Sequence, residues 1–326
     1  MPTPTDAADR STVGSISILT DDEVTAAVDQ HAAIASIREV LLSAHRGTAH
    51  GIAKTMSQWG GSSTAHSLGA VDMQQRVVAF KNWVNTPRGA SALLSLFDST
   101  EGRPLAVMSA GALGMLRTAG TAAAATDILA TPDAAVMAVL GTGRQALQQV
   151  HAVLGVRRLE LVRVWSPSVR SREAFARQVT DVFGMAVEVA DNAEQAVRGA
   201  SIITTVTRSN EPFVDGAWLE DGAHLNAIGA ILPTAAELLP TVLPLSGLTV
   251  VDDLENARRA SRELREYFGA DLTGVMTLGE AIDRGVTRPP DTRLTVFKGV
   301  GSGLTDLAIA CLVWRTVEAS HTEGLS

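Results

Sequence analysis

The stretch that decides the fold runs from residue 135 to residue 146 and reads AVMAVLGTGRQA. Six apolar residues of strand length lead into a G-x-G-x-x-A turn, and a helical pattern follows at Leu147, Val150 and Val153. The glycines let the backbone approach a diphosphate, and the helix N-terminus offers it free N–H groups. The motif in this context predicts a dinucleotide-binding fold with a nicotinamide or flavin cofactor; an ordinary tight strand–helix turn is the alternative.

Strand-like and helical segments alternate from this motif onward. Strands are expected at 135–140, 159–165, 186–190, 201–206, 224–229, 248–252 and 294–300. Helices are expected at 144–154, 171–183, 192–198 and 255–267. Such alternation predicts an α/β fold with a Rossmann-type, doubly wound parallel sheet.

The residues before the motif have a different pattern. They suggest, in order, a helix over 21–41 capped by Asp21 or Asp22, a polar and glycine-rich region over 47–69, strands at 76–83, 92–97 and 104–109, and a helix over 112–129. Antiparallel strands followed by a helix are typical of an α+β domain. We expect the final apolar helix, from Leu304, to fold back onto this region. Residues 1–128 and 304–326 then form a discontinuous substrate-binding and dimerisation domain, and residues 129–303 form the dinucleotide-binding domain.

Composition excludes several classes of protein. The chain has 326 residues and a net charge of −8, so neither nucleic acid nor an anionic membrane is an expected partner. Its one cysteine, Cys311, is expected in the core and rules out an internal disulfide, which fits the cytoplasm. The histidines have no metal-ligand spacing, no apolar run reaches the ~20 residues of a membrane span, and residues 1–14 are expected to be a flexible tail without signal-peptide features.

The end of the second expected strand bears on the choice of cofactor. An acidic residue usually stands there to bind the ribose 2′-OH of NAD, but this chain has Ser166, followed by Ser168, Arg170 and Arg172. A hydroxyl and a guanidinium suit a 2′-phosphate, so NADP(H) is favoured over NAD(H). The alternative is that both arginines are solvated on the next helix, which Ser168 or Ser171 could cap.

Further segments then appear in a familiar order. They are FKNWVNTPRG at 80–89, LRTAGTAA at 116–123, SIITTVT at 201–207, LNAIGA at 225–230 and VGSGLTD at 300–306. With GTGRQA between them, the sequence resembles the ornithine cyclodeaminase/μ-crystallin family over about residues 15–320. The resemblance implies NAD(H) or NADP(H) binding and an α-amino or α-imino acid substrate.

The resemblance also implies roles for individual residues. Lys81 and Arg117 match the lysine at the substrate and the arginine that binds its carboxylate, while Thr118 matches a threonine that reaches cofactor phosphate. Val300 and Gly301 match the segment that packs on the nicotinamide. The remaining cofactor-binding candidates are Gly141, Thr142, Gly143, Arg144, Gln145, Thr205, Val206, Thr207, Ala227, Ile228 and Gly229.

Simple chemistry supports the first two assignments. A carboxylate substrate needs a permanently charged, planar partner, which Arg117 provides, and hydride transfer to C=N needs a proton near the nitrogen, which Lys81 can supply. The structural alternatives are a surface ion pair for Arg117 and a strand lysine with a buried stem for Lys81.

Three positions depart from the family pattern or stay open. Ile231 stands where cyclodeaminases and alanine dehydrogenases carry an aspartate, so this part of the substrate pocket is expected to be apolar. Lys54 is a candidate replacement for an early arginine that binds the substrate carboxylate. His66 is a candidate proton donor, with a hydrogen-bonded structural histidine as the alternative.

The leading expectation is NAD(P)H-dependent reduction of a small α-imino (ketimine) carboxylate to an α-amino acid. One rival is an amino-acid dehydrogenase or ornithine cyclodeaminase, which the missing aspartate disfavours. The other is a non-catalytic, NADPH-dependent binding protein. Relatives dimerise through the sheets of their first domains, so a homodimer built by residues 1–128 and the last helix is expected.

Overall fold

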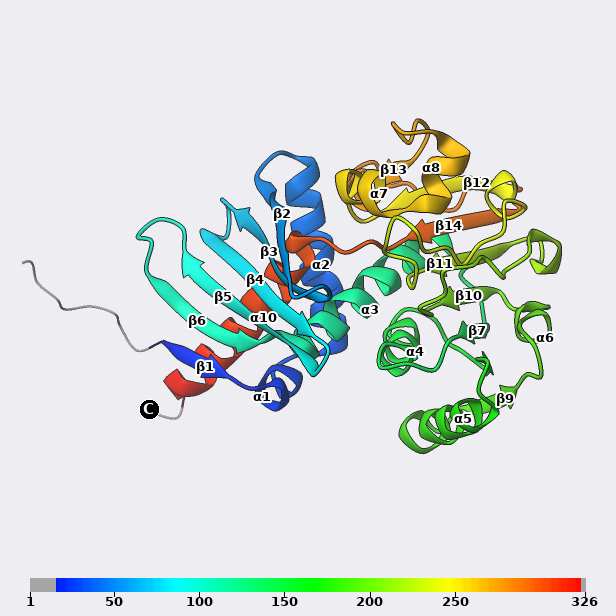
Figure 1. Ribbon diagram of the computed structural model, residues 1–326, viewed down its shortest axis with the longest axis horizontal. Helices are drawn as coiled ribbons and strands as arrows, with labels where there is room; N and C mark the ends of the chain where they lie inside the picture. Colours follow the sequence, from blue (N-terminus) through cyan, green and yellow to red (C-terminus); the bar gives the residue numbers. More distant parts are fainter. Residues whose placement is uncertain (1–15, 324–326) are drawn as a thin grey trace, which may run out of the picture.

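Two separate β-sheets organise the chain in this computed structural model, which describes residues 16–323 (Figure 1). One sheet is built from the first third of the chain, and the other is built from Val136 onward, starting with the strand that leads into the G-x-G motif. Helix α3 (Ala110–Leu129) lies between them. No helix in the described part of the chain is long and apolar enough to cross a membrane.

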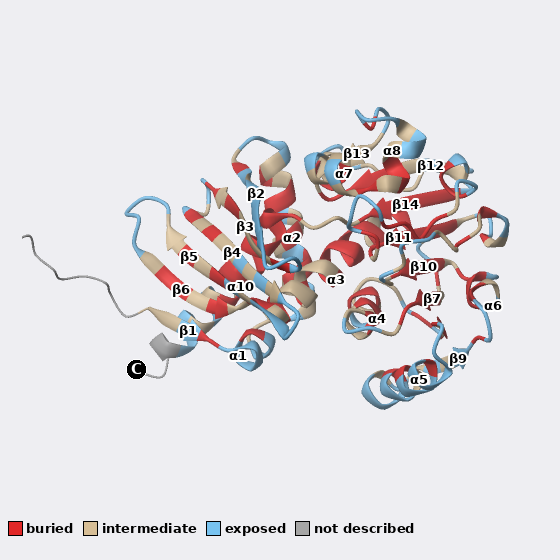
Figure 2. Cartoon of the chain, viewed as in Figure 1, coloured by how far each residue is buried: buried red, intermediate tan, exposed pale blue. Residues whose placement is uncertain are grey.

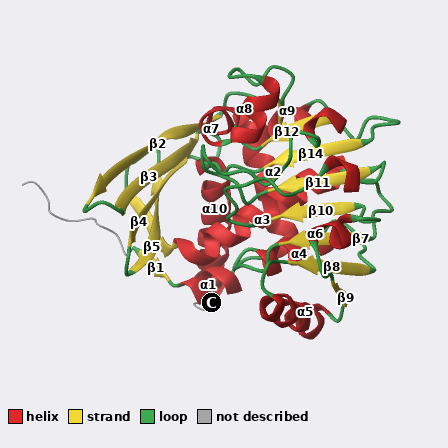
Figure 3. Ribbon diagram, turned by 45° about the vertical axis from the view of Figure 1, so that its right-hand side comes forward, coloured by secondary structure: helices red, strands yellow, loops and turns green. Residues whose placement is uncertain are grey.

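The larger sheet has eight strands, and every pairing in it is parallel. In spatial order they are β13 (Met276–Thr277), β12 (Ser246–Val251), β14 (Leu294–Lys298), β11 (Ala223–Ala227), β10 (Ile202–Thr205), β7 (Val136–Leu140), β8 (Leu161–Trp165) and β9 (Ala186–Val189). Central strands β10, β11 and β14 are buried along their whole length because helices cover both faces (Figure 3). The predicted doubly wound fold is confirmed.

Helices of this part connect the parallel strands. They are α4 (Ala146–Leu154), α5 (Val169–Phe183), α6 (Ala193–Val197), α7 (Leu254–Ala260), α8 (Arg262–Phe268) and α9 (Leu278–Asp283). The single helix expected over 255–267 is wrong. Ser261 has an extended backbone that ends α7, and its hydroxyl accepts a hydrogen bond from Leu264 N (3.3 Å), which caps α8.

The smaller sheet has six strands in the order β1 (Ser17–Leu19), β6 (Pro104–Ser109), β5 (Gly89–Asp98), β4 (Val77–Thr86), β3 (Ser63–Asp72) and β2 (Ala49–Trp59). Strands β2 to β6 pair antiparallel in hairpin order, and β1 pairs parallel with β6. The strands expected near 76–83, 92–97 and 104–109 are present. Region 47–69 contains β2 and much of β3, so reading it as a polar stretch without strands was incomplete: β2 is exposed along nearly all its length, and no apolar alternation marks it (Figure 2).

Four helices pack against this sheet or beside it: α1 (Asp21–Ala26), α2 (Gln30–His45), α3 and α10 (Gly303–Glu323). The one helix expected over 21–41 is two helices, and neither Asp21 nor Asp22 is the cap. Thr20 caps α1 by accepting from Glu23 N, and Asp29 caps α2 by accepting from Ala32 N. The Asp21 carboxylate instead accepts from Ala112 N (2.7 Å) at the start of α3.

The end of the chain returns to the first sheet. Helix α10 packs against α2 and α3 and contacts β3 and β4, so it lies among elements from the first third of the chain (Figure 1). Cys311 on this helix is buried, as predicted, and burial raises the pKa of its thiol to about 12.

Helix α3 is fixed at both sides of the molecule. It packs on α1 and β5 at one side and on α4, β11 and β14 at the other. The Arg157 guanidinium donates to the carbonyls of Thr126, Asp127 and Ala130 at its C-terminal end and forms an ion pair with the Asp127 carboxylate (3.0 Å). Residues in the middle of α3 are therefore held at the junction of the two sheets.

Candidate functional site

Two adjoining cavities lie where the sheets face each other. One, of about 920 Å³, follows the G-x-G turn and the carboxyl ends of β7, β10 and β11. The other, of about 880 Å³, lies against β4 and β5. Both are lined by Arg117, Arg144, Ile231, Val300 and Gly301, so they form one continuous cleft.

The first cavity begins at the point where the strand order reverses, between β7 and β10. Gly141 has a φ of +117°, and a Cβ there would lie 2.8 Å from Val206 O, so the turn requires glycine. A Cβ on Gly143 would meet nothing within 4 Å, which leaves space for a ligand to approach the backbone. Helix α4 starts beside it without a side-chain cap. Ala146 N donates to Gly143 O (3.0 Å), whereas the N–H groups of Leu147 and Gln148 have no hydrogen-bond partner among the described residues. This cradle fits the diphosphate of a dinucleotide.

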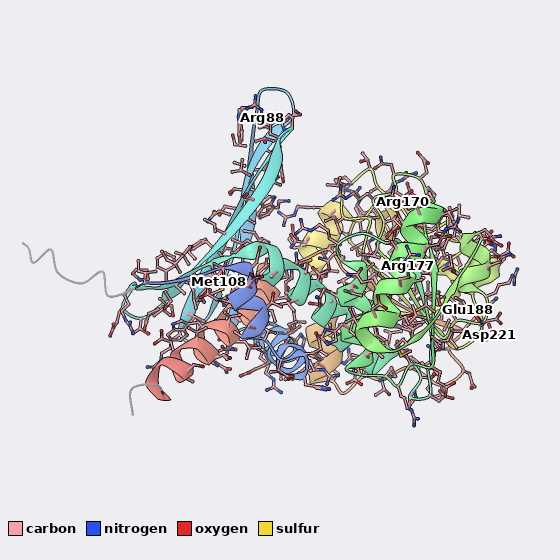
Figure 4. The ribbon with its side chains drawn as sticks, turned by 90° about the horizontal axis from the view of Figure 1, so that it is seen from below. Arg88, Met108, Arg170, Arg177, Glu188 and Asp221 are labelled. Atoms are coloured by element: carbon pink, nitrogen blue, oxygen red, sulfur yellow. The ribbon has the colours of Figure 1, made fainter. Side chains whose placement is uncertain are left out.

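Most of the predicted cofactor-binding residues line this first cavity. They are Thr118, Gly141, Thr142, Gly143, Arg144, Gln145, Ser166, Val206, Thr207, Ile228, Gly229, Val300 and Gly301. Three predicted residues do not line it. Thr205 is fully buried and donates to Glu237 Oε2 (2.8 Å), and Ala227 is buried inside β11. Arg170 is exposed in the first turn of α5, on the outer surface of the molecule (Figure 4).

The two arginines after β8 have different surroundings. Ser168 caps α5 by accepting from Ser171 N, so the helix-cap alternative applies to that serine. Arg172 is buried and donates to Ala190 O, which turns its guanidinium away from the cavity. Ser166 is 5% exposed, with its hydroxyl beside that of Thr142 (3.2 Å). Of these two arginines, Arg170 is the one whose guanidinium has no hydrogen-bond or ion-pair partner among the described residues.

Glu237 is a residue of this site that the sequence analysis missed. Its fully buried carboxylate accepts from the hydroxyl of Thr205, from the N–H and hydroxyl of Thr207 (2.7 Å each), and from Gly229 N and Ala230 N. It thereby ties the loops after β10 and β11 together beneath the cavity. A glutamate inside the apolar run TAAELLP was the available signal.

Asp252, directly after β12, plays a similar part and was also missed. Its carboxylate accepts from Val300 N (3.0 Å) and Gly301 N (2.8 Å), so it holds the segment expected against the nicotinamide. Burial raises the pKa of Asp252 to about 6, and the two N–H donors oppose that rise.

The second cavity contains a charged cluster from three distant parts of the chain. Lys81 on β4 donates to both carboxylate oxygens of Asp306 (2.9 Å each), and Arg117 Nε on α3 lies 3.1 Å from Asp306 Oδ1. Asp306, in the first turn of α10, is only 2% exposed, against 11% for Lys81 and 17% for Arg117. The structure thus brings the predicted Lys81 and Arg117 together and adds Asp306 as their shared counterion.

The electrostatics of this cluster shift the pKa of Lys81. Burial lowers the pKa of its ammonium group, the neighbouring charges of Arg117 and Lys54 lower it further, and the Asp306 carboxylate opposes the shift. A lysine with a lowered pKa and a fixed hydrogen-bond partner is suited to proton transfer near neutral pH.

Trp83 on β4 connects the cluster with the mouth of the cavity. The ammonium of Lys81 lies 5.7 Å from the centroid of its indole, and that of Lys54 lies 5.0 Å from it. Lys54 is exposed in the cleft, and loss of water around it followed by the charge of Arg259 lowers its pKa. Lys54 therefore lines the same cavity as Lys81, as predicted.

His66 is not among the residues that line this cavity. Its ring stacks on Trp83 (4.7 Å between centroids), and Nε2 lies 2.9 Å from the Thr64 hydroxyl. Burial, followed by the charge of Lys54, lowers its pKa. These contacts fit the structural alternative for His66.

Ile231 lines both cavities and is 49% exposed, so an apolar side chain faces the cleft as predicted. Among the residues described, no group of three or more His, Cys, Asp or Glu side chains is placed to hold a metal ion.

Comparison with known proteins finds a family and relatives that this chain resembles. The family model of the ornithine cyclodeaminase/mu-crystallin family matches residues 19–321. Ketimine reductase mu-crystallin of Mus musculus is 35% identical over 223 residues, 68% of each chain, and Delta(1)-pyrroline-2-carboxylate reductase of Bacillus cereus is 31% identical over 76% of this chain and 78% of its own.

A solved structure is also similar to this chain over most of its length. An archaeal alanine dehydrogenase dimer with bound NAD is 28% identical and superimposes with a TM-score of 0.86, covering 94% of this chain and 97% of its own. Together, the match over residues 19–321 and these similarities show that the chain belongs to the ornithine cyclodeaminase/mu-crystallin family.

Proposed function

We propose that this chain is a nicotinamide-dependent imine reductase that converts a small α-imino carboxylate to an α-amino acid. The observation that carries the proposal is the convergence of Lys81 and Arg117 on Asp306, in a cavity continuous with the dinucleotide cradle. The names of the relatives from Mus musculus and Bacillus cereus, a ketimine reductase and a pyrroline-2-carboxylate reductase, support the same chemistry.

Each residue of the cluster has a separate task. When bound, a nicotinamide cofactor would supply the hydride for the imine carbon. Arg117 pairs with the substrate carboxylate and so orients the C=N bond, and Lys81 holds a proton at the imine nitrogen. Asp306 keeps Lys81 charged and fixes both cations where the substrate binds.

Ile231 favours reduction over the two rival activities. An amino-acid dehydrogenase or a cyclodeaminase must bind an α-ammonium group and accept a proton from it, and an isoleucine side chain can do neither. A ketimine already carries the C=N bond and needs only a hydride and a proton. The exposed apolar side chain of Ile231 in the cleft is therefore compatible with an imine substrate.

The proposal extends to the organisation of the protein. Residues 1–128 and 304–326 form the substrate-binding and dimerisation domain, and residues 129–303 form the dinucleotide-binding domain. The support is that α10 packs among the first elements while the G-x-G turn belongs to the parallel sheet. Cytoplasmic location remains a prediction from the single cysteine.

The ionisation of Lys81 is open to direct measurement because the chain has only three lysines, Lys54, Lys81 and Lys298. Lysine labelled with ¹³C at Cε gives three signals, which single Lys→Arg variants assign. We expect Lys81 to titrate below the ordinary value of about 10.4 because burial disfavours its charge. Asp306→Asn should move the midpoint lower still, since it removes the attraction that opposes the shift. A midpoint at the ordinary value, or an upward move in Asp306→Asn, contradicts this account.

Substitution should separate binding from proton transfer. Lys81→Ala should lower kcat for imine reduction about 10²-fold, the usual scale for loss of a positioned proton donor. Arg117→Ala should mainly raise KM, roughly ten- to hundredfold, because the carboxylate contact exists before and during the reaction. Steady-state oxidation of NADPH with a panel of cyclic and acyclic imines measures both.

Arg177→Ala is the matched control, because this arginine is exposed on the outer face of α5 (Figure 4). It should leave both constants as they are in the unchanged protein. Full turnover in Lys81→Ala would place the proton donor elsewhere, and unchanged constants in both Lys81→Ala and Arg117→Ala would mean that the site is misassigned.

NADPH should bind more tightly than NADH, by about 1–3 kcal/mol, through charge-assisted contacts to the 2′-phosphate. The residues expected to make them are Ser166, which lines the cavity, and Arg170, which is exposed in the first turn of α5, four residues further along the chain. Arg170→Gln should weaken NADPH binding more than NADH binding, whereas Arg177→Gln, two turns further along α5, should affect neither. Titration of both cofactors by nicotinamide fluorescence decides this, and a preference for NADH would refute the assignment.

The outer face of the smaller sheet predicts a homodimer. Strand register places Val78, Phe80, Val84, Leu93 and Phe97 on this one face, and none of them is fully buried. An uncovered apolar sheet face is a candidate for pairing with a second copy. The β4–β5 hairpin, with Arg88 near its tip, projects beyond the rest of the molecule (Figure 4). Light scattering at micromolar concentration should give the mass of two chains, and Val84→Asp combined with Leu93→Asp should reduce it; a monomer before substitution would contradict the prediction.

A further inference from the structure

The cavity that contains Lys81 has a marked excess of positive charge. Five cationic side chains line it: Lys54, Lys81, Arg117, Arg144 and Arg259. The one carboxylate in the lining, that of Asp21, already accepts a hydrogen bond from the start of α3. Asp306 beneath the cavity adds a second negative charge. The lining therefore carries more positive charge than one substrate α-carboxylate would neutralise.

Three of the five cations have a partner in the proposed reaction. Lys81 and Arg117 share Asp306 and face the imine nitrogen and the α-carboxylate. Arg144 belongs to the G-x-G turn and also lines the first cavity, where a dinucleotide diphosphate fits. Lys54 and Arg259 remain. Within the described part of the chain, neither forms an ion pair with a carboxylate.

These two cations come from opposite walls of the cleft. Lys54 lies on β2 of the smaller sheet, and Arg259 lies on α7 beside the parallel sheet, and the two elements face each other (Figures 1 and 3). Arg259 donates to Asn256 Oδ1 (2.5 Å), and Asn256 Nδ2 donates to Gly301 O (2.8 Å). Arg259 is thus fixed to the segment that borders the reacting centre. Lys54 is held over Trp83, next to Lys81.

The two side chains also act on each other. Arg259 is close enough to lower the pKa of Lys54, which means that their like charges repel. An anionic group placed between them removes this repulsion and gains two charge-assisted hydrogen bonds. A substrate with an apolar tail would leave both cations facing each other across the cleft without a counterion.

We infer that Lys54 and Arg259 form a subsite for a second anionic group, so that the preferred substrate is an α-imino dicarboxylate. The inference rests on the proposed function. In this arrangement the α-carboxylate meets Arg117, the imine nitrogen meets Lys81, and the distal carboxylate lies at the mouth between Lys54 and Arg259. Hydride from the cofactor adds to the imine carbon, the nitrogen gains a proton, and the product is an α-amino dicarboxylate.

The experiment compares substrates of equal chain length with and without the distal charge. A 2-oxo acid in ammonium buffer forms its imine by condensation with ammonia and loss of water. The pairs are oxaloacetate with 2-oxobutanoate, and 2-oxoglutarate with 2-oxopentanoate, each with NADPH and with NADH. Oxidation of the cofactor gives kcat/KM for every substrate.

The intact protein should reduce each dicarboxylate with a kcat/KM at least tenfold above that of its matched monocarboxylate. Arg259→Gln should lower this ratio at least tenfold. Arg258→Gln is the control, because the neighbouring arginine pairs with Glu255 and Asp271 O and does not line the cavity. A ratio at or below one in the intact protein overturns the inference, and so does a ratio that Arg259→Gln leaves unchanged.

Binding of products separates this inference from the proposed function. Calorimetry of the complex with NADP⁺ compares L-glutamate with L-norvaline, its matched monocarboxylate. If L-glutamate binds more tightly than L-norvaline and Arg259→Gln abolishes the difference, the subsite is upheld. This holds even if no imine is reduced, in which case only the proposed imine reduction is refuted. If the protein reduces monocarboxylate imines and binds the two amino acids equally well, the subsite is overturned. The proposed function then still stands.

Discussion

The carboxylate of Asp306 is the group on which the rest of the site depends. It lies at the start of α10, is almost fully buried, and binds Lys81 from β4 and Arg117 from α3. Two buried cations without this anion would repel each other and lose the hydrogen bonds that offset their removal from water. Because α10 packs against the first sheet, it places the Asp306 carboxylate next to Lys81 and Arg117 and so provides the counterion for both.

The dinucleotide side of the cleft is organised by buried carboxylates as well. Glu237 ties the loops after β10 and β11 together, and Asp252 holds the Val300–Gly301 segment. Backbone N–H groups at the ends of parallel strands have no partner within the sheet, and these two acids satisfy them without presenting charge to the cofactor. The loops along this side of the cleft are therefore fixed by buried carboxylates, while Lys54 and Arg259 line the second cavity without a carboxylate partner among the described residues.

The sequence predicts the parallel sheet well because short strand-like segments alternate with helical segments after the first strand. It fails for β2, whose side chains are nearly all exposed, and for the break at Ser261, where a single cap divides one helical pattern into two helices. Within the site, Lys81, Arg117 and Asp306 all stand in quoted motifs, but the pairing was not predicted, since 225 residues separate Lys81 from Asp306. Thr205 and Ala227 were placed at the cavity because a motif cannot show at which residue a strand emerges from the core; both lie one step too deep.

The central claim is that Lys81, kept charged by Asp306, supplies the proton as hydride reaches the imine carbon. Stopped-flow single turnover of the NADPH complex with a cyclic ketimine carboxylate, recorded across pH, tests it most directly because it isolates the chemical step from product release. The account predicts that the rate declines at high pH as Lys81 loses its proton, and that Asp306→Asn moves this decline to lower pH. Identical pH profiles for the intact protein and Asp306→Asn would contradict it.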